Sequence, residues 1–500
     1  MQQLTGVDSG FLSMETRHQF GHVSSVTVFD PGDRSGGAGF EATRQLILDR
    51  LHLLEPFRRR LVEVPFGLDH PYWIEDPDFD VDFHVRHIAV PAPGEREQLA
   101  ELVARLIARP LDRSRPLWEY YVIEGLQGGR IAHLNKIHHA TIDGASGAQM
   151  LAKLLDLDPD HQPGGPPPEL PPAEEEPTPG ELLARTAASL IAQPRKAIGL
   201  QVRALRSVAD TTRTQGPAGL ADLLARGLPG PLGEPLRRQR TEALREREER
   251  DGIIAPVVPA FTAPSTPWNH PISTHRRFAY DTLSLSAAKA VKNALGVTLN
   301  DVVMAITAGA LRTYLLKHDA LPEEPLITMV PVSVRSADEA DTYSNRVSGI
   351  LAPLGTHLDD PIERVRSVHE AMAGAKETHD AVPAELLQDF SQFATPALST
   401  LANRLAIRAR LTERVNPVNL VISNVPGPRE PLYSSGARLE HFYPVSTIVD
   451  GQGLNVTVQS YLDNLDFGLV ADRELVPDLW WMMDLFREEL DVLHHATGTA

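Results

Sequence analysis

Residues 119–147, EYYVIEGLQGGRIAHLNKIHHATIDGASG, contain two apolar runs rich in β-branched and aromatic residues, separated by a pair of glycines. Runs of this kind on either side of a glycine turn are typical of a β-hairpin. The second run ends at the adjacent histidines His138 and His139, and residues 144–157 have the pattern of a helix. We therefore predict a β-strand that ends at the two histidines, followed by a short loop and a helix.

The two histidines are not expected to share one site. Successive side chains of an extended strand point to opposite faces, so one imidazole can face a cleft while the other supports the fold. The chain has no cysteine and no H-E-x-x-H spacing, and we therefore expect no metal at this position. Asp143 stands immediately before Gly144 and the predicted helix, where its simplest role is to cap the helix N-terminus.

Composition limits the classes of function. A chain of 500 residues, 42% of them hydrophobic, is long enough for two or three domains with a sizeable interior. Its formal charge of −18 argues against a nucleic-acid partner, which would require clustered Lys and Arg. The absence of cysteine fits a reducing compartment. We find neither the pattern of a signal peptide nor an uninterrupted apolar stretch of transmembrane length, and we expect a cytoplasmic protein that meets a membrane only at its surface.

The chain divides into two α+β units and a segment between them. Residues 1–160 mix strand-like alternation with helical periodicity, and a second α+β unit is predicted at 266–500. The intervening segment, 161–265, begins within a Pro-rich acidic stretch (158–180) that is unsuited to a core and is predicted to be a linker. Two units of similar size joined in this way suggest a pseudo-dimer.

The segment between the units also contains an amphipathic helical pattern at 181–213 with six basic residues. Two interpretations remain open. The helix packs on its own protein with its basic face in solvent, or it lies on a membrane surface.

In the second unit, Ser286 is a candidate cap for a helix that stops at Gly296, and Thr298 with Asp301 forms a T-x-x-D capping box that opens another helix. The later apolar runs around Asp450-Gly451-Gln452-Gly453 suggest a meander of antiparallel strands. The remaining predicted elements are strands at 326–335 and 418–424 and a last helix at about 477–495.

The combination His138, His139, three residues, Asp143 and Gly144 resembles the H-H-x-x-x-D-G signature of acyltransferases with the chloramphenicol-acetyltransferase-like fold. Condensation domains of peptide synthetases belong to the same group. The resemblance implies two subdomains of this fold with an active-site tunnel between them.

The surrounding blocks narrow the resemblance to the bacterial wax ester synthase/acyl-CoA:diacylglycerol acyltransferase family. It covers both α+β units, fades only across about 160–265, and shows no departure within the signature. The blocks that carry it include Pro116-Leu117-Trp118, LNDVVMA (299–305, with Asn300 and Asp301), VPVSVR (330–335), SNVPGP (423–428, with Asn424, Pro426 and Gly427) and GLNVTVQSYLDNLDFGLVAD (453–472).

The resemblance also implies roles for these residues. His139 would be the general base that takes the proton from a substrate hydroxyl as its oxygen attacks the thioester of acyl-CoA. His138 is the less suitable base, and Asp143 would hold the loop. Asn300 would donate a hydrogen bond near the developing oxyanion. For Asn300 and Asp301 a role in capping the helix remains an alternative.

The function implied is an acyl-CoA-dependent O-acyltransferase that makes triacylglycerol from diacylglycerol or wax ester from a long-chain alcohol. Acyl-CoA is then a substrate, no cofactor is needed, and the apolar acceptor favours peripheral contact with a membrane or lipid droplet. The alternatives are a carrier-protein-dependent acyltransferase or condensation enzyme of the same fold, and a non-catalytic lipid-surface protein.

A second HHAT lies near the C-terminus, at His494 and His495, where Thr499 takes the place of the aspartate. These histidines are predicted to end a helix, a position that suits cationic side chains. We interpret this second copy as unrelated to the signature.

Overall fold

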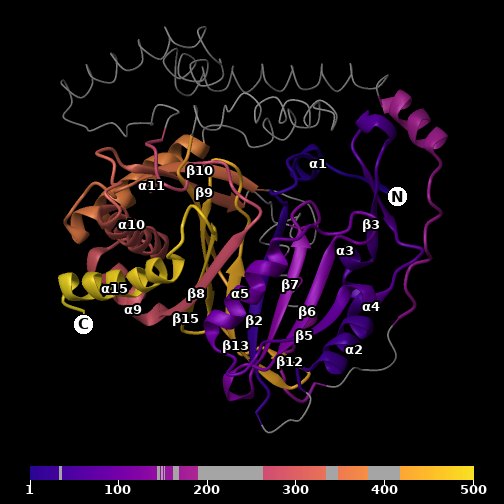
Figure 1. The fold of residues 1–500 in the computed structure, drawn as a ribbon, viewed down its shortest axis with the longest axis horizontal. Helices are drawn as coiled ribbons and strands as arrows, with labels where there is room; N and C mark the ends of the chain where they lie inside the picture. Colours follow the sequence, from indigo (N-terminus) through magenta and orange to yellow (C-terminus); the bar gives the residue numbers. More distant parts are fainter. Residues whose placement is uncertain are drawn as a thin grey trace.

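In the computed structural model, the residues that are described form two six-stranded sheets and one three-stranded sheet, with helices on their faces (Figure 1). The structure describes residues 1–32, 37–142, 147, 150, 153–161, 168–189, 263–333, 347–380 and 417–499. The two large sheets confirm the predicted α+β architecture of two units.

The N-terminal sheet has the strand order β12-β13-β2-β7-β6-β5. Its neighbours are antiparallel except for β5 and β6, which run parallel. The strands of this sheet are β2 (His22–Asp30), β5 (Val85–Ala89), β6 (Trp118–Glu124), β7 (Ile131–His138), β12 (Tyr433–Ser434) and β13 (Ala437–Val445).

Helix α5 (Arg96–Ile107) covers one face of the N-terminal sheet. A capping box between Glu95 and Gln98 starts the helix, and its apolar side, with Leu99 and Val103, is fully buried. The same helix contacts strand β8 of the other large sheet, so it lies where the two units meet (Figure 1). Helices α2 (Phe40–Arg50), α3 (Glu55–Arg58) and α4 (Val81–His84) lie on the opposite face of the sheet. Their apolar side chains and those of the sheet form a second apolar cluster.

The C-terminal sheet has the strand order β10-β9-β11-β14-β15-β8. Four helices lie on one of its faces (Figure 1) and, together with the sheet, enclose the largest apolar cluster among the described residues. The strands are β8 (Arg276–Ser284), β9 (Leu326–Ser333), β10 (Val347–Leu354), β11 (Leu420–Val425), β14 (Leu454–Tyr461) and β15 (Asn464–Asp472), and the helices are α9 (Leu285–Leu295), α10 (Leu299–Lys317), α11 (Pro361–Asp380) and α15 (Leu479–Thr497).

Helix α10 forms the centre of the helical layer. The predicted capping box of Thr298 and Asp301 is present at its start. Further along, Gly309 leaves room for the carboxylate of Glu489, since a Cβ at this glycine would lie 2.0 Å from Cδ of Glu489. That carboxylate forms a buried ion pair with Arg364 of α11, so a buried salt bridge joins α11 to α15 beside α10.

Two predictions for the second unit were wrong in detail. The cap of α9 is Ser284, whose side chain accepts a hydrogen bond from the backbone of Ala287, whereas Ser286 lies inside the helix. The expected meander is only a hairpin of β14 and β15, because β13 pairs with β2 in the other sheet. The two sheets approach closely there: a Cβ on Gly468 would lie 1.8 Å from the carbonyl oxygen of Pro444.

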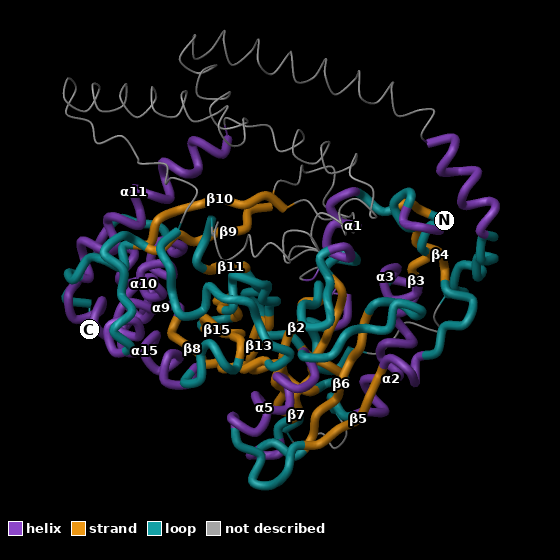
Figure 2. The backbone as a smooth tube through the Cα atoms, turned by 45° about the horizontal axis from the view of Figure 1, so that its top comes forward, coloured by secondary structure: helices purple, strands orange, loops and turns teal. Residues whose placement is uncertain are grey.

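The small sheet has the order β1-β4-β3 and lies beside helix α1 (Gly6–Ser13), near the N-terminus (Figure 2). Its strands are β1 (Gln2–Gln3), β3 (Arg59–Val62) and β4 (Tyr72–Glu75). Residues 168–178 contain no helix or strand and are followed by helix 179–189. That helix packs Leu182 against the small sheet, and the rest of the predicted amphipathic helix lies outside the described residues.

Among the described helices, none is by itself long and apolar enough to cross a membrane. Helices α9 and α10 reach that length and composition only when they are taken together, and their axes are bent by 103°.

Candidate functional site

The paired histidines lie where strand β7 ends. Strand β7 forms the predicted hairpin with β6, and the turn between them contains Gly128 and Gly129, both with a φ of +73°. On its other edge β7 pairs with β2, in a register that places His138 opposite His22. The predicted position of the histidines at the end of a hairpin strand is confirmed.

Both ring nitrogens of His138 take part in hydrogen bonds, and the residue is 1% exposed. Nδ1 accepts from the backbone N–H of Ala140 (3.0 Å), and Nε2 contacts Oε1 of Glu15 at 3.1 Å. Because Nδ1 is an acceptor, the proton of the neutral ring lies on Nε2, which donates to the carboxylate. The hydrogen bonds therefore hold the imidazole of His138 in one tautomer, with its lone pair already used.

Glu15 follows helix α1, and its carboxylate accepts hydrogen bonds from three groups. Its Oε1 accepts from His138 and from the backbone N–H of Gly21 (2.8 Å), and its Oε2 accepts from Nη2 of Arg113 (2.8 Å). Burial alone would raise the pKa of Glu15, but these donors outweigh burial and lower the pKa from 4.5 to about 2. Glu15 is therefore ionised throughout the neutral range. No local pattern in the sequence indicates this role for Glu15.

His139 has different partners. Its imidazole stacks on the ring of Phe11 in helix α1, with the ring centroids 4.2 Å apart and the planes inclined by 8°. Its backbone N–H donates to the carbonyl oxygen of Gly21 (2.8 Å). The side chain is half-buried. The two imidazoles thus occupy distinct environments, one enclosed beside a carboxylate and the other stacked against an aromatic ring.

Pro116, Leu117 and Trp118 support the end of β7. The carbonyl oxygen of Leu117 accepts from the backbone N–H of His138 (2.9 Å), and that of Pro116 accepts from the N–H of Trp118 (2.8 Å). The indole of Trp118 stacks on Phe57 at 4.0 Å and donates to its carbonyl oxygen (2.9 Å). Leu117 and Trp118 are fully buried, which favours a structural role for this element.

Asp143 and Gly144, the last two residues of the signature, lie outside the described residues. The expected capping or loop-holding role of Asp143 stays a prediction.

The other predicted residues lie in the C-terminal unit, at the start of α10 and the end of β11. Asp301 accepts from the N–H of Thr298 (2.9 Å) and contacts Nδ1 of His369 at 2.7 Å, so its carboxylate secures the helix start. Asn300, the neighbouring residue, accepts from Nδ2 of Asn424 at 3.4 Å. This contact joins two of the predicted residues across α10 and β11.

Gly427 marks a close backbone approach after β11. A Cβ at this position would lie 1.9 Å from the carbonyl oxygen of Ser460, and the N–H of Gly427 donates to Oγ of Ser460 (3.1 Å). Any larger residue would displace the chain. Pro426, the preceding residue, is exposed. The SNVPGP block therefore anchors the end of β11 on β14.

The segment before β2 connects the two units next to the histidines. Oγ1 of Thr447 donates to the carbonyl oxygen of Phe20 (2.7 Å), and the N–H of Asp450 donates to Oε1 of Gln19 (3.1 Å). Since Gly21 contacts both Glu15 and His139, this segment links the C-terminal unit directly to the histidine pair.

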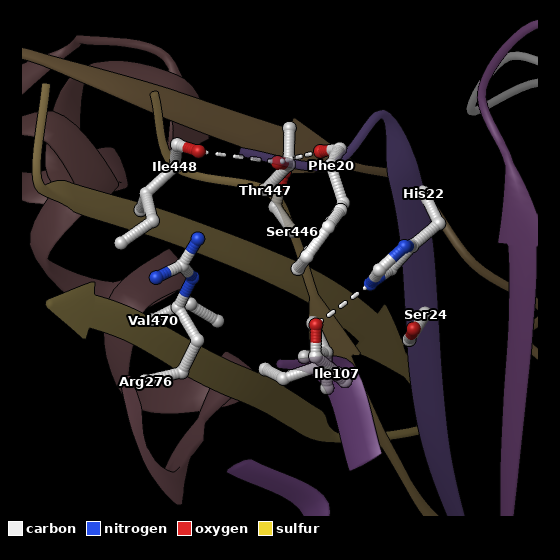
Figure 3. Close-up of a pocket in the computed structure, with 10 residues that line it drawn as sticks. Phe20, His22, Ser24, Ile107, Arg276, Ser446, Thr447, Ile448 and Val470 are labelled. Atoms are coloured by element: carbon white, nitrogen blue, oxygen red, sulfur yellow. Dashed lines mark hydrogen bonds between the residues drawn. The ribbon is translucent and has the colours of Figure 1, made fainter. Parts of the chain in front are cut away.

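A pocket lies beside this connection, between the two large sheets (Figure 3). Arg276 lines it and donates to the carbonyl oxygen of His18, while burial lowers the pKa of Arg276 to about 10. Nε2 of His22 contacts the carbonyl oxygen of Ile107 at 2.9 Å, and burial keeps the pKa of His22 well below its usual range. Nδ1 of His22 and Oγ of Ser24 have no hydrogen-bond partner within the described parts of the chain. The contact between the units at this point therefore combines buried polar groups with apolar side chains.

Comparison with known proteins identifies two matching family models. The wax ester synthase/diacylglycerol acyltransferase catalytic domain matches residues 4–248 and 239–303, and the C-terminal domain of the same family matches residues 343–494. Together these matches cover most of the chain.

Individual relatives agree with the family models. A probable diacylglycerol O-acyltransferase of Mycobacterium tuberculosis is 37% identical, over 98% of each chain. The O-acyltransferase WSD of Acinetobacter baylyi is 33% identical, over 98% of this chain and 97% of its own length. The solved wax ester synthase/diacylglycerol acyltransferase of Marinobacter aquaeolei VT8 superposes with a TM-score of 0.67 at 31% identity, over all of both chains. The starter condensation domain of rhizomide synthetase shares the fold alone, with a TM-score of 0.52 at 12% identity.

Proposed function

Because the chain belongs to the wax ester synthase/diacylglycerol acyltransferase family, we propose that it transfers a long-chain acyl group from acyl-CoA to the hydroxyl of diacylglycerol or of a long-chain alcohol. Membership of the family makes the chain an acyltransferase. The names of its relatives include diacylglycerol O-acyltransferases and a wax ester synthase, which supports these two acceptors.

The hydrogen bonding of His138 carries the choice of the base. Both ring nitrogens of His138 hydrogen-bond within the fold, so this residue is not available as the base. The other histidine of the signature, His139, is half-buried and stacks on Phe11. His139 is therefore the base. It removes the proton from the acceptor hydroxyl as that oxygen attacks the thioester carbonyl, the C–S bond then breaks, and the imidazolium returns the proton to the sulfur, so that CoA leaves as the thiol. Assistance of this kind supplies about 10²- to 10⁴-fold in rate.

The other residues of the site position the base and stabilise the negative charge that develops on the thioester oxygen. Glu15 and His138 fix the end of β7, and Asp143 holds the loop after His139. Asn300 donates a hydrogen bond from its Nδ2 to the oxyanion that develops on the thioester carbonyl. Its Oδ1 accepts from Nδ2 of Asn424, which orients the amide group. The thioester is already activated, so the reaction needs no covalent enzyme intermediate and no cofactor.

The substrates meet in an apolar passage between the two units, shielded from water. The acceptor is a lipid, and the enzyme works from the cytoplasm at a membrane or lipid-droplet surface, in peripheral contact with it.

A direct assay tests the reaction class. Purified protein is mixed with palmitoyl-CoA and with dioleoylglycerol, hexadecanol or no acceptor, and free thiol and ester are both measured. We expect thiol release that depends on the acceptor, with an equal amount of ester recovered by lipid chromatography. Release of thiol without ester would assign the chain a hydrolase activity instead, and no release with either acceptor would point to a carrier-bound donor.

A further inference from the structure

A short loop between β3 and β4 carries a large aromatic side chain into solvent. Phe66 lies at the tip of this loop and is 83% exposed, and Leu68, two residues later, is 45% exposed. The apolar residues on either side, Val64 and Tyr72, are buried in a cluster with Leu182 of helix 179–189. The loop therefore separates two groups of apolar residues, one directed into the protein and one directed out of it.

The exposed position of Phe66 is built into the loop. The N–H of Gly67 donates to the carbonyl oxygen of Val64 (3.0 Å), and at the base of the loop the carbonyl oxygen of Pro71 accepts from the N–H of Leu4 (2.9 Å). Phe66 itself has a φ of +60°, a backbone conformation that is unfavourable for a bulky side chain and suits glycine. The loop therefore has a solvent-exposed phenylalanine at a position where glycine would relieve backbone strain.

This loop is linked to the histidine pair. Glu63 at its start forms an ion pair with Nη1 of Arg113 (3.2 Å), and the same guanidinium binds Glu15, the partner of His138. The small sheet and α1 also share an apolar cluster that reaches the residue after His139. Its members are Leu4, Leu12, Leu61, Trp73, Leu111, Leu117 and Ala140, with Phe11 packed against them.

The charge of the loop restricts what it can meet. Residues 63–71, EVPFGLDHP, include Glu63 and Asp69 but no Lys or Arg. Attraction to anionic headgroups requires basic residues, so the loop is unsuited to an anionic surface. An exposed aromatic ring beside an aliphatic side chain instead fits the boundary between headgroups and acyl chains.

We propose that Phe66 and Leu68 insert into a bilayer of electrically neutral, zwitterionic headgroups and thereby bring the edge of α1 and the small sheet, next to His138 and His139, to the membrane that contains the acceptor lipid. This inference rests on the proposed function for its choice of a lipid surface.

Vesicle flotation without substrate tests the proposal. Wild-type protein is compared with Phe66→Ser, Phe66→Gly and a control, Leu316→Ser, which removes a half-exposed leucine from α10 in the other unit. With phosphatidylcholine vesicles, we expect both Phe66 variants to lose about tenfold in partitioning, in line with the burial of one aromatic ring. The control should remain within about twofold of the wild type.

Phe66→Gly separates insertion from folding. Because glycine relieves the positive φ, this variant should melt at the wild-type temperature or above while it loses membrane binding. A second readout uses the absence of cysteine in the chain. A polarity-sensitive fluorophore on Leu68→Cys should shift to the blue with vesicles, whereas the same label on Val492→Cys of α15 should not.

Three results would overturn the proposal: wild-type binding that is unchanged in both Phe66 variants, binding only to vesicles with anionic lipid, or no spectral shift at position 68. Failure of the proposed function is recognised separately, because it appears as absence of ester from palmitoyl-CoA and detergent-dispersed dioleoylglycerol or hexadecanol, without vesicles, with the wild-type protein.

Discussion

Replacement of His139 by alanine should lower kcat for acyl transfer by about 10²- to 10⁴-fold, because the acceptor hydroxyl loses its general base. The measurement is the initial rate of CoA release with saturating palmitoyl-CoA and acceptor. The fold should persist, since the substitution removes only one half-buried ring that stacks on Phe11. Binding of acyl-CoA, followed by equilibrium titration, should change little.

The chain offers a matched control in its second HHAT. His495 lies near the end of α15 and is exposed, with Nδ1 2.7 Å from the carbonyl oxygen of Asp491. His495→Ala should retain the wild-type rate. Equal losses in the two variants, or a wild-type rate in His139→Ala, would remove His139 from the mechanism.

Replacement of Glu15 by glutamine should reduce both activity and stability, because the carboxylate holds His138, Gly21 and Arg113 together. A neutral amide cannot accept from all three, and its own NH₂ group would face the guanidinium. We expect kcat to fall about tenfold with KM nearly unchanged, as for a residue that positions the base without contacting substrate.

The stability effect has a defined pH dependence. The pKa of Glu15 in the folded protein is about 2, below its ordinary value of 4.5. The ionised form therefore stabilises the fold above pH 4.5, and this stabilisation, about 3 kcal/mol, is lost as the pH falls from 4.5 towards 2. Wild-type protein should lose more unfolding free energy over this interval than Glu15→Gln, as measured by urea denaturation at each pH.

Glu63→Gln is the control for the loss of charge next to Arg113. Glu63 pairs with the same guanidinium at 3.2 Å, but its side chain is 62% exposed. An exposed ion pair contributes about 0–1 kcal/mol, so this variant should keep its activity and most of its stability. If both variants behave alike, Glu15 acts only through Arg113 and does not position His138.

Features set by local sequence were predictable. The glycine turn and the apolar runs on both sides of it define the β6–β7 hairpin, and the strand ends at His138 as expected. The capping box of Thr298 and Asp301 was also predictable, because both partners lie within one helical turn. The cap of α9 was misplaced by two residues, since Ser284 and Ser286 both have suitable side chains and their hydroxyls contact each other at 2.8 Å.

Features set by long-range pairing were not predictable from local patterns. Strand β13 has the alternation of any half-buried strand, and nothing in its sequence indicates that it joins β2 rather than β14. Glu15 was missed for the same reason. Once β2 is known to pair with β7, the residues just before His22 must lie beside His138, but the sequence alone does not say which strands are neighbours.

The central claim is that the acyl group passes in one step from the thioester to the hydroxyl that His139 deprotonates. A single-turnover experiment with ¹⁴C-palmitoyl-CoA and excess enzyme tests it most directly, with the label in CoA ester, in precipitated protein and in lipid followed over time. We predict that label leaves the CoA ester only after acceptor is added and appears at once in triacylglycerol or wax ester, without passing through the protein fraction. Label that accumulates on the protein before the acceptor is added, and then moves to lipid, would contradict the claim.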